Sequence, residues 1–169
     1  SAPCSVHLSE SREEVEFLET GGGAWRALLE DLGSWDPQWV PPGVSPVRFL
    51  DEEGFLDGRV IAVHGVQMDD DDLARVARHG ATLVACPRSN QRTGAGDPPI
   101  ARFYASGVRV AVGTDSLAST PDLNVFAELQ AMRSLAPGVP AARLIESATR
   151  HGAHALGFGA DYGTIEPGK

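Results

Sequence analysis

Four short apolar segments, each followed by a polar turn and then by a stretch with helical periodicity, constrain the fold of this chain more than any other feature. The segments cover residues 4–8, 60–63, 81–85 and 108–112. Repeated units of strand, loop and helix predict a parallel sheet with helical crossovers. Because apolar residues run through these segments with little alternation, we expect both faces of the sheet to be covered.

The segments between the strands carry recognisable helix signals. Ser11 stands three residues before Glu14, which is the spacing of a capping box, and Ser45 precedes Pro46 as an N-cap precedes a first-turn proline. The acidic run 69–72 predicts a solvated helix N-terminus, because it lacks the ligand spacing and the glycine of a calcium loop. Further helices are predicted over residues 69–79, 100–106, 122–135 and 140–156, and a polar loop over residues 86–99.

Four such units suit either a small doubly wound sheet or half of an eight-stranded barrel. In both architectures the chemistry lies at the carboxyl ends of the parallel strands. The sequence places His7, His64, Cys86 and Asp115 at those ends. A nucleotide-binding sheet is the weaker alternative, because the glycine-rich stretches 21–23 and 94–96 match neither a phosphate-loop nor a dinucleotide fingerprint.

The strand-end residues have the chemistry of a metal site with an acid and a base. His7 is followed by Glu10 at the turn into a helix, while His64 and Asp115 end later strands. Neutral imidazoles and carboxylates are good ligands for zinc or iron, and a nearby carboxylate can move the protons of a metal-activated water. Each residue alone is more often structural, as a hydrogen-bonded histidine or a turn aspartate. Their shared position at one edge favours a functional site.

Other conspicuous residues fit structural roles. His79 lies at a predicted helix C-terminus, where a cation suits the helix dipole. His151 and His154 lie late in a predicted helix, and Met68 and Met132 are assigned to packing. Trp35 and Trp39 either line a pocket or cover the core, and packing is the favoured interpretation.

Composition limits the class of protein. The chain has 169 residues, with 14 Lys and Arg against 23 Asp and Glu, which gives a formal charge of −9. This balance argues against an ordinary nucleic-acid binder, and no apolar run approaches the roughly 18 residues that a membrane span needs. Two distant cysteines and a start without a signal-peptide pattern predict a cytoplasmic protein. The chain does not begin with methionine, so we expect it to be part of something longer.

Four motifs in order carry a family resemblance. They are HLSES at residues 7–11, VHGV at 63–66, CPRSN at 86–90 and GTDSLAS at 113–119. Together they resemble the second half of an amidohydrolase-superfamily barrel, closest to its metal-dependent deaminase and chlorohydrolase branch. GTIEPGK at 163–169 also resembles the link from that barrel to a small β-sandwich. The resemblance implies one partial domain over residues 1–169, formed by strands five to eight of a TIM-type barrel and ending at the link to a missing β-sandwich.

The resemblance also implies residue roles. His7 and Asp115 would bind one divalent metal, zinc or iron, and Asp115 would also take a proton from the hydrolytic water. Glu10 would protonate the ring nitrogen of the substrate, and His64 would polarise and orient the water. The implied substrate-binding residues are Arg88, Ser89 and Asn90.

One departure from the family pattern matters. The family's metal site also needs a His-x-His pair on the first barrel strand, and no such pair occurs in these 169 residues. We therefore expect a fragment of an enzyme that deaminates a small purine-like aromatic amine, inactive on its own. Its partners would be a small-molecule substrate and either a second copy of the chain or the missing N-terminal half, with neither nucleic acid nor membrane. The alternative is a catalytically silent half-barrel that a partner chain or self-association completes.

Overall fold

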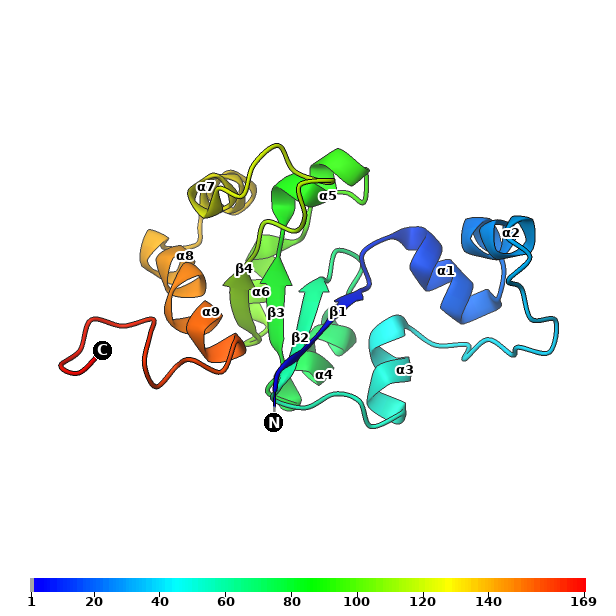
Figure 1. The fold of residues 1–169 in the computed structure, drawn as a ribbon, viewed down its shortest axis with the longest axis horizontal. Helices are drawn as coiled ribbons and strands as arrows, with labels where there is room; N and C mark the ends of the chain where they lie inside the picture. Colours follow the sequence, from blue (N-terminus) through cyan, green and yellow to red (C-terminus); the bar gives the residue numbers. More distant parts are fainter. Residues whose placement is uncertain (1) are drawn as a thin grey trace.

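The computed structural model describes residues 2–169 and contains a four-stranded parallel sheet in the order β1–β2–β3–β4 (Figure 1). The strands are β1 (Cys4–Leu8), β2 (Val60–His64), β3 (Thr82–Ala85) and β4 (Arg109–Val112). Each lies within a residue of its predicted segment. The prediction of parallel βα units is confirmed.

Nine helices accompany the sheet within the described residues. α1 and α2 extend to one side beyond β1, whereas α8 and α9 lie at the opposite side, next to β4 (Figure 1). None of the helices in this part of the chain is long and apolar enough to cross a membrane. Their bounds are α1 (Arg12–Thr20), α2 (Gly23–Asp31), α3 (Pro46–Glu52), α4 (Asp70–Arg78), α5 (Pro87–Thr93), α6 (Ile100–Ala105), α7 (Val125–Leu135), α8 (Ala141–Ala148) and α9 (Arg150–Ala155).

The predicted caps form at two helix starts. The Ser11 side chain accepts a hydrogen bond from the backbone N–H of Glu14 at 3.2 Å at the start of α1. The Ser45 side chain caps α3 in the same way, with Pro46 in the first turn. These bonds satisfy backbone donors that a helix N-terminus leaves without intrahelical partners.

The predicted polar loop over residues 86–99 is wrong for its first half, which forms α5. Pro87 stands in the first turn, where its missing N–H costs nothing, and Gly94 ends the helix with a left-handed φ of 79°. Apart from Pro87 in the first turn, the side chains it buries are polar, namely Ser89 and Asn90, so the helix has no apolar stripe. Hydrophobic periodicity therefore gave no sign of it.

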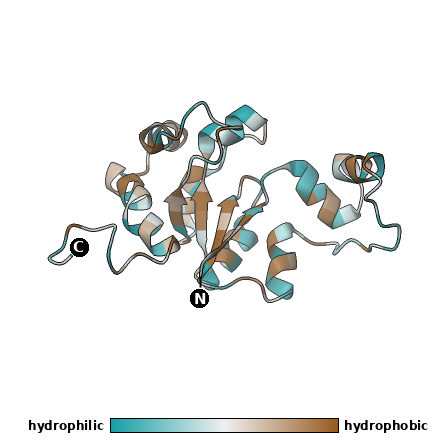
Figure 2. Cartoon of the chain, viewed as in Figure 1, coloured by the Kyte–Doolittle hydropathy of each residue, from teal (hydrophilic) through white to brown (hydrophobic). Residues whose placement is uncertain are grey.

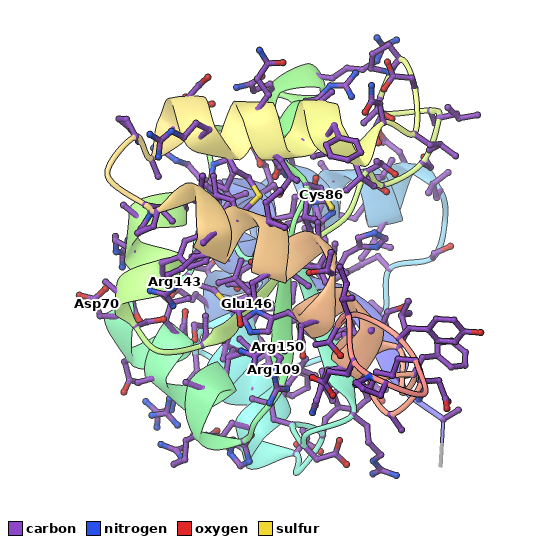
Figure 3. All side chains as sticks on the ribbon, turned by 90° about the vertical axis from the view of Figure 1, so that its left-hand side faces the viewer. Asp70, Cys86, Arg109, Arg143, Glu146 and Arg150 are labelled. Carbon is purple, nitrogen blue, oxygen red and sulfur yellow. The ribbon has the colours of Figure 1, made fainter. Side chains whose placement is uncertain are left out.

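Two predicted helix boundaries also differ. α7 begins at Val125 rather than after Asp122, because Asn124 supplies the cap by accepting the backbone N–H of Ala127 at 3.2 Å. The helix expected over residues 140–156 is divided at Thr149, whose φ of −122° and ψ of −90° are not helical. An ion pair between Glu146 of α8 and Arg150 of α9 spans the break (Figure 3).

The acidic run 69–72 at the start of α4 is only partly solvated, contrary to expectation. Asp69 is the N-cap, and its carboxylate accepts the N–H of Asp72 at 2.8 Å. The Asp72 side chain is buried and accepts a hydrogen bond of 2.5 Å from the Ser45 hydroxyl. This run therefore joins α4 to the start of α3.

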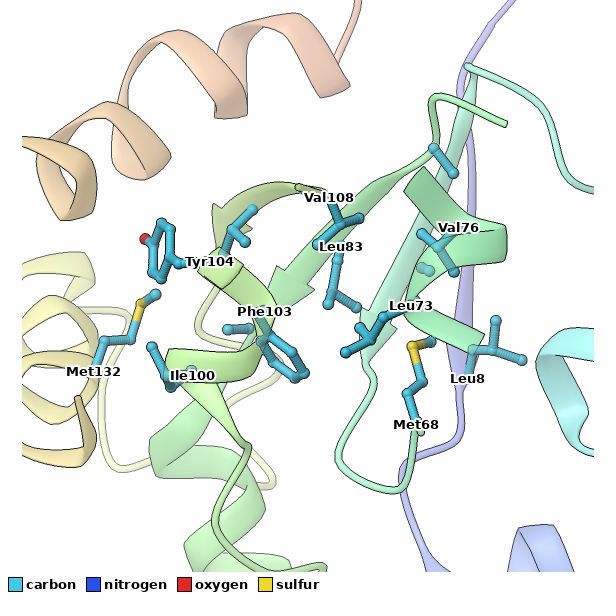
Figure 4. Close-up of a cluster of buried hydrophobic side chains, with 14 of the residues drawn as sticks. Leu8, Met68, Leu73, Val76, Leu83, Ile100, Phe103, Tyr104, Val108 and Met132 are labelled. Atoms are coloured by element: carbon cyan, nitrogen blue, oxygen red, sulfur yellow. The ribbon is translucent and has the colours of Figure 1, made fainter. Parts of the chain in front are cut away.

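The core lies on one face of the sheet, where α4, α6 and α7 pack against the strands (Figures 2 and 4). Leu83 and Val110 come from neighbouring strands in register, and Phe103 of α6 is fully buried among them. Met68 and Met132 are buried in this cluster, as predicted.

The opposite face differs from the expectation that both faces of the sheet are covered. It carries the alternate residues of each strand, and none of them belongs to the core cluster of the described residues. Ile61 and Ala111 are buried there, while Val63 and Val84 are half-buried. His7 lies on this face and is exposed.

Candidate metal and catalytic site

The carboxyl ends of the four parallel strands bring the predicted residues to one edge of the sheet. β1 carries His7 and leads to Glu10, β2 ends at His64, and β4 leads to Asp115. β3 leads directly into α5. Because the strands are parallel and in register, these chain segments meet although they are far apart in sequence.

Three of these residues form a cluster of possible metal ligands. One donor atom each from His7, His64 and Asp115 lies within 4.8 Å of the others. His7 Nε2 is 3.9 Å from Asp115 Oδ1, and the rings of His7 and His64 stack with centroids 5.0 Å apart. The 3.9 Å separation is too long for a hydrogen bond, so His7 and Asp115 stand close without bonding each other.

Asp115 is held by donors from two directions. Its Oδ2 accepts hydrogen bonds from the hydroxyls of Ser89 at 2.7 Å and Ser119 at 2.9 Å, and its Oδ1 accepts the N–H of Ser116 at 2.8 Å. Partial burial by itself raises the pKa of Asp115, but these hydrogen bonds outweigh it and lower the pKa below its usual value. Asp115 is therefore ionised at neutral pH.

His64 is fully buried and has one hydrogen-bonding partner. The side-chain amide Nδ2 of Asn90 lies 3.0 Å from His64 Nδ1 and 3.5 Å from Glu10 Oε1. Since a carboxylate oxygen only accepts, the amide N–H₂ end must face Glu10, and it donates its other hydrogen to His64 Nδ1. Burial lowers the pKa of His64, although the carboxylate of Glu10 raises it, so the ring is neutral. The neutral ring then carries its hydrogen on Nε2.

His64 Nε2 has no hydrogen-bonding partner within the described residues. It lies 3.6 Å from Glu10 Oε2 and 4.0 Å from Asp115 Oδ2. A buried polar atom without a partner is costly, so this atom fits a site that receives a further group or water. The ionised Asp115 and the imidazole of His7 offer lone pairs that suit a divalent metal, and the Nε2–H of His64 can donate a hydrogen bond to a water beside it.

Glu14 supports the turn that carries Glu10, a role the sequence did not reveal. The buried carboxylate of Glu14 accepts the backbone N–H groups of Ser9 at 2.7 Å and Glu10 at 2.8 Å. Burial raises the pKa of Glu14, against the lowering effect of these bonds. Its capping-box spacing was the available signal, but the carboxylate also bonds the two residues before the cap, Ser9 and Glu10.

The three predicted substrate-binding residues divide into two groups. Ser89 and Asn90 are fully buried and contact Asp115, His64 and Glu10 as described above. Arg88 turns away, because its guanidinium donates to Asp122 at 2.7 Å and lies 3.6 Å from Glu128. The structure therefore brings two of the three to the cluster.

The backbone is unusual at this edge. Ser9, His64 and Asp115 are the described non-glycine residues with positive φ, at 51°, 79° and 59°. Strict alternation along β2 would place His64 on the core face with Ala62, yet its ring stacks on His7 of the opposite face. After it, Gly65 has a φ of 63°, and a Cβ there would approach Leu83 Cδ1 to 2.8 Å. Such conformations cluster at functional sites.

The remaining histidines lie outside the cluster. His79 caps α4 and bonds Asp51 at 2.6 Å, and His151 bonds the carbonyl of Val110 at 2.8 Å. His154 is exposed. These positions agree with the structural roles that the sequence predicted.

Comparisons with known proteins agree on one family. The amidohydrolase family model matches residues 1–169. The aminodeoxyfutalosine deaminase of Deinococcus radiodurans is 40% identical over 165 residues, which cover 92% of this chain and 38% of that protein.

Two solved structures resemble the fold. The adenosine deaminase of Xanthomonas campestris with bound zinc has a TM-score of 0.79 and 32% identity, over 99% of this chain and 35% of that one. The aminofutalosine deaminase of Helicobacter pylori in complex with methylthio-coformycin has a TM-score of 0.80 and 27% identity, over 97% and 40%.

The chain thus spans about two fifths or less of the length of each of these proteins. Its four parallel strands and their helices form part of a TIM-type barrel. With a family match over its whole length, the chain belongs to the amidohydrolase superfamily.

Proposed function

We propose that this chain carries part of the active site of a metal-dependent aminohydrolase, which removes an amino group from a small purine-like aromatic amine by hydrolysis. The observation that carries the proposal is the cluster of His7, His64 and Asp115 beside Glu10 at the strand ends. The deaminases among the similar proteins, one of them a structure with bound zinc, support both the reaction class and a divalent metal.

His7 and Asp115 are the residues that hold the metal. Imidazole nitrogen and carboxylate oxygen suit zinc or iron, and the low pKa of Asp115 keeps it in the form that binds a cation. A divalent metal bound there supplies Lewis-acid activation of water at neutral pH. The imidazole of His7 is exposed on the open face of the sheet, within reach of such an ion.

The chain's own residues move the protons. Asp115 takes a proton from the attacking water, and His64 orients that water by donating a hydrogen bond from Nε2. Glu10 protonates the substrate's ring nitrogen, where negative charge develops as water adds to the carbon that bears the amine. Glu10, now a carboxylate, takes the remaining proton of the added water and passes it to the amine as the carbonyl forms. The carbon–nitrogen bond breaks, the nitrogen leaves as ammonia, and the proton held by Asp115 returns to Glu10.

The α5 residues border the substrate and fix the catalytic groups. Ser89 holds Asp115, and Asn90 holds both His64 and Glu10. Arg88 stays a prediction as a substrate-binding residue, since its guanidinium binds carboxylates on α7 and the loop before it.

Residues outside this chain complete the site. The remaining metal ligands come from a polypeptide beyond these 169 residues or from a second copy, because His7 and Asp115 are two of the four protein ligands that the family pattern requires. We also propose that residues 163–169 lead from the barrel domain into a small β-sandwich.

Metal content tests this function. We expect protein that contains the complete site, loaded with zinc and dialysed, to retain zinc by plasma mass spectrometry, and His7→Ala in that protein to lose most of it. His154→Ala removes an exposed histidine away from the cluster and serves as the control. Equal zinc in the wild type and His7→Ala would overturn the ligand role of His7. In protein that contains the complete site, Glu10→Gln should abolish ammonia release from adenosine-type amines while metal content stays unchanged.

A further inference from the structure

One fully buried carboxylate takes no part in the proton transfers. Glu128 lies on α7, the helix that also carries the core residues Leu129 and Met132. Its Oε2 accepts the backbone N–H of Arg88 on α5 at 3.1 Å. Its Oε1 has no hydrogen-bonding partner within the described residues. Because burying a carboxylate costs free energy, we looked for the role of Glu128 in the contacts that it makes.

Helix α5 has no cap from its own segment. The side chain of its N-cap, Cys86, makes no hydrogen bond to the helix, and Pro87 in the first turn has no N–H. The N–H of Arg88 is therefore the first backbone donor inside the helix. Because α7 packs beside α5, the Glu128 carboxylate can accept this N–H and take the place of the missing cap (Figure 1).

Glu128 also faces the side chain of the residue whose N–H it accepts. Nη1 of Arg88 lies 3.6 Å from Glu128 Oε1 and donates to Asp122 Oδ1 at 2.7 Å. Both the backbone and the side chain of Arg88 are thus held by α7 and the loop before it. Since α7 is anchored in the core by Leu129 and Met132, these contacts fix the first turn of α5 relative to the core.

The next two residues of α5 are the ones that hold the candidate site. Ser89 donates to Asp115 at 2.7 Å, and Asn90 Nδ2 lies 3.0 Å from His64 Nδ1. Because these residues directly follow Arg88, a displacement of the first turn of α5 moves both donors. Hydrogen bonds weaken steeply as their distance and angle depart from the favoured values, so both contacts depend on where this turn lies.

We propose that Glu128 is a positioning residue of the candidate active site: it fixes the first turn of α5 and thereby the donors that Ser89 and Asn90 present. Glu128 touches no reacting atom and acts only through Arg88. The effect on catalysis rests on the proposed function, whereas the effect on the His64 ring does not.

Variants of protein that contains the complete site test the proposal. Glu128→Ala removes the acceptor of the Arg88 N–H, whereas Glu128→Gln keeps the shape and one oxygen that can accept it. Met132→Ala removes a fully buried side chain one turn further along α7 and controls for a general loss of stability. Urea denaturation checks that each variant is folded. If Glu128→Ala does not fold, Glu128→Asp replaces it, because the shorter side chain withdraws the carboxylate from Arg88.

Magnetic resonance of the metal-free protein measures the positioning itself. In Glu128→Ala we expect the Arg88 amide hydrogen to exchange with solvent faster relative to the other amides of α5 and α7. We also expect the two ¹⁵N signals of the His64 ring to move toward each other, because Asn90 no longer holds one tautomer. Glu128→Gln should keep the wild-type exchange and ring signals. Met132→Ala should keep the ring signals despite its lower stability.

Ammonia release from adenosine-type amines gives the kinetic measurement. We expect Glu128→Ala to lower kcat by about tenfold or more and to change KM by less than about threefold, since a misplacement of about 1 Å can cost about 100-fold in rate. Glu128→Gln should recover most of the lost kcat, and Met132→Ala should keep it at a temperature where the variant is folded.

The outcomes separate this inference from the proposed function. Unchanged His64 signals in folded Glu128→Ala would overturn the positioning role, whether or not the protein deaminates. Equal changes in Met132→Ala would overturn it too, because they would reflect a general loosening of α7. If the wild type releases no ammonia while the His64 signals respond as expected, the proposed function fails and the positioning role stands.

Discussion

Asn90 fixes which ring nitrogen of His64 carries the hydrogen. In Asn90→Ala we expect the hydrogen to distribute between the two ring nitrogens. The variant removes the donor that lies 3.0 Å from His64 Nδ1 and leaves this nitrogen buried without a partner. An unsatisfied buried acceptor costs about 1–3 kcal/mol of unfolding free energy. For a chain of this length, about 2–4 °C of melting temperature is lost per kcal/mol, so we expect a decrease of about 2–12 °C.

The decisive assay is the ¹⁵N spectrum of the histidine rings in metal-free protein. In the wild type we expect His64 Nε2 to give the resonance of a protonated ring nitrogen and Nδ1 that of an unprotonated one. In Asn90→Ala these two signals should move toward each other as the tautomers mix.

The chain offers a matched control in its other asparagine. Asn124→Ala removes the N-cap of α7 and should cost about 1 kcal/mol, yet it makes no contact with His64 and should leave the histidine signals unchanged. A wild-type spectrum with the hydrogen on Nδ1 would refute the tautomer assignment. It would also remove the reason for treating His64 as a donor to water.

Three further predictions concern reactivity, pH and stability. Cys86 is buried, and burial together with nearby carboxylates raises its pKa to about 12, so iodoacetamide should label exposed Cys4 quickly and Cys86 only upon unfolding. Although burial alone would raise the pKa of Asp51, hydrogen bonds from its arginine and histidine partners lower it. Urea titrations should therefore show Asp51→Asn less stable than the wild type above about pH 4. The difference should disappear as the pH falls through the depressed native pKa, and a gap that persists in acid would contradict this origin. Phe103→Ala should lower the unfolding free energy by about 3–5 kcal/mol, because Phe103 is fully buried, whereas Phe158→Ala should change it by less than about 0.5 kcal/mol.

The sheet could be predicted because its strands are marked by composition alone. The strand segments are mostly apolar, and Gly80 and Gly107 stand just before the third and fourth of them. Parallel strands end at one edge by geometry, so the polar residues after them had to meet there. His7, His64 and Asp115 were found in this way without any knowledge of their distances.

The residues that support the site could not be predicted from the positions of the strand ends. α5 buries Ser89 and Asn90 instead of an apolar stripe, so its pattern resembles that of a loop. Ser119 bonds Asp115 from within a turn, where serine is common for other reasons. Hydrophobic periodicity reports burial of apolar surface, and a polar network leaves no periodic signal.

The geometry of the cluster depends on this polar network more than on the strands. Ser9, His64 and Asp115 hold positive φ values, and such conformations cost about 1–3 kcal/mol each in residues other than glycine. At each of these positions a hydrogen bond opposes relaxation, from Ser9 N–H to Glu14 at 2.7 Å, from Asn90 to His64, and from the serine hydroxyls to Asp115. The strand ends bring the side chains near one another, and the left-handed backbone conformations at Ser9, His64 and Asp115 orient them toward the cluster. A substitution in the network should therefore alter the site while the sheet stays folded.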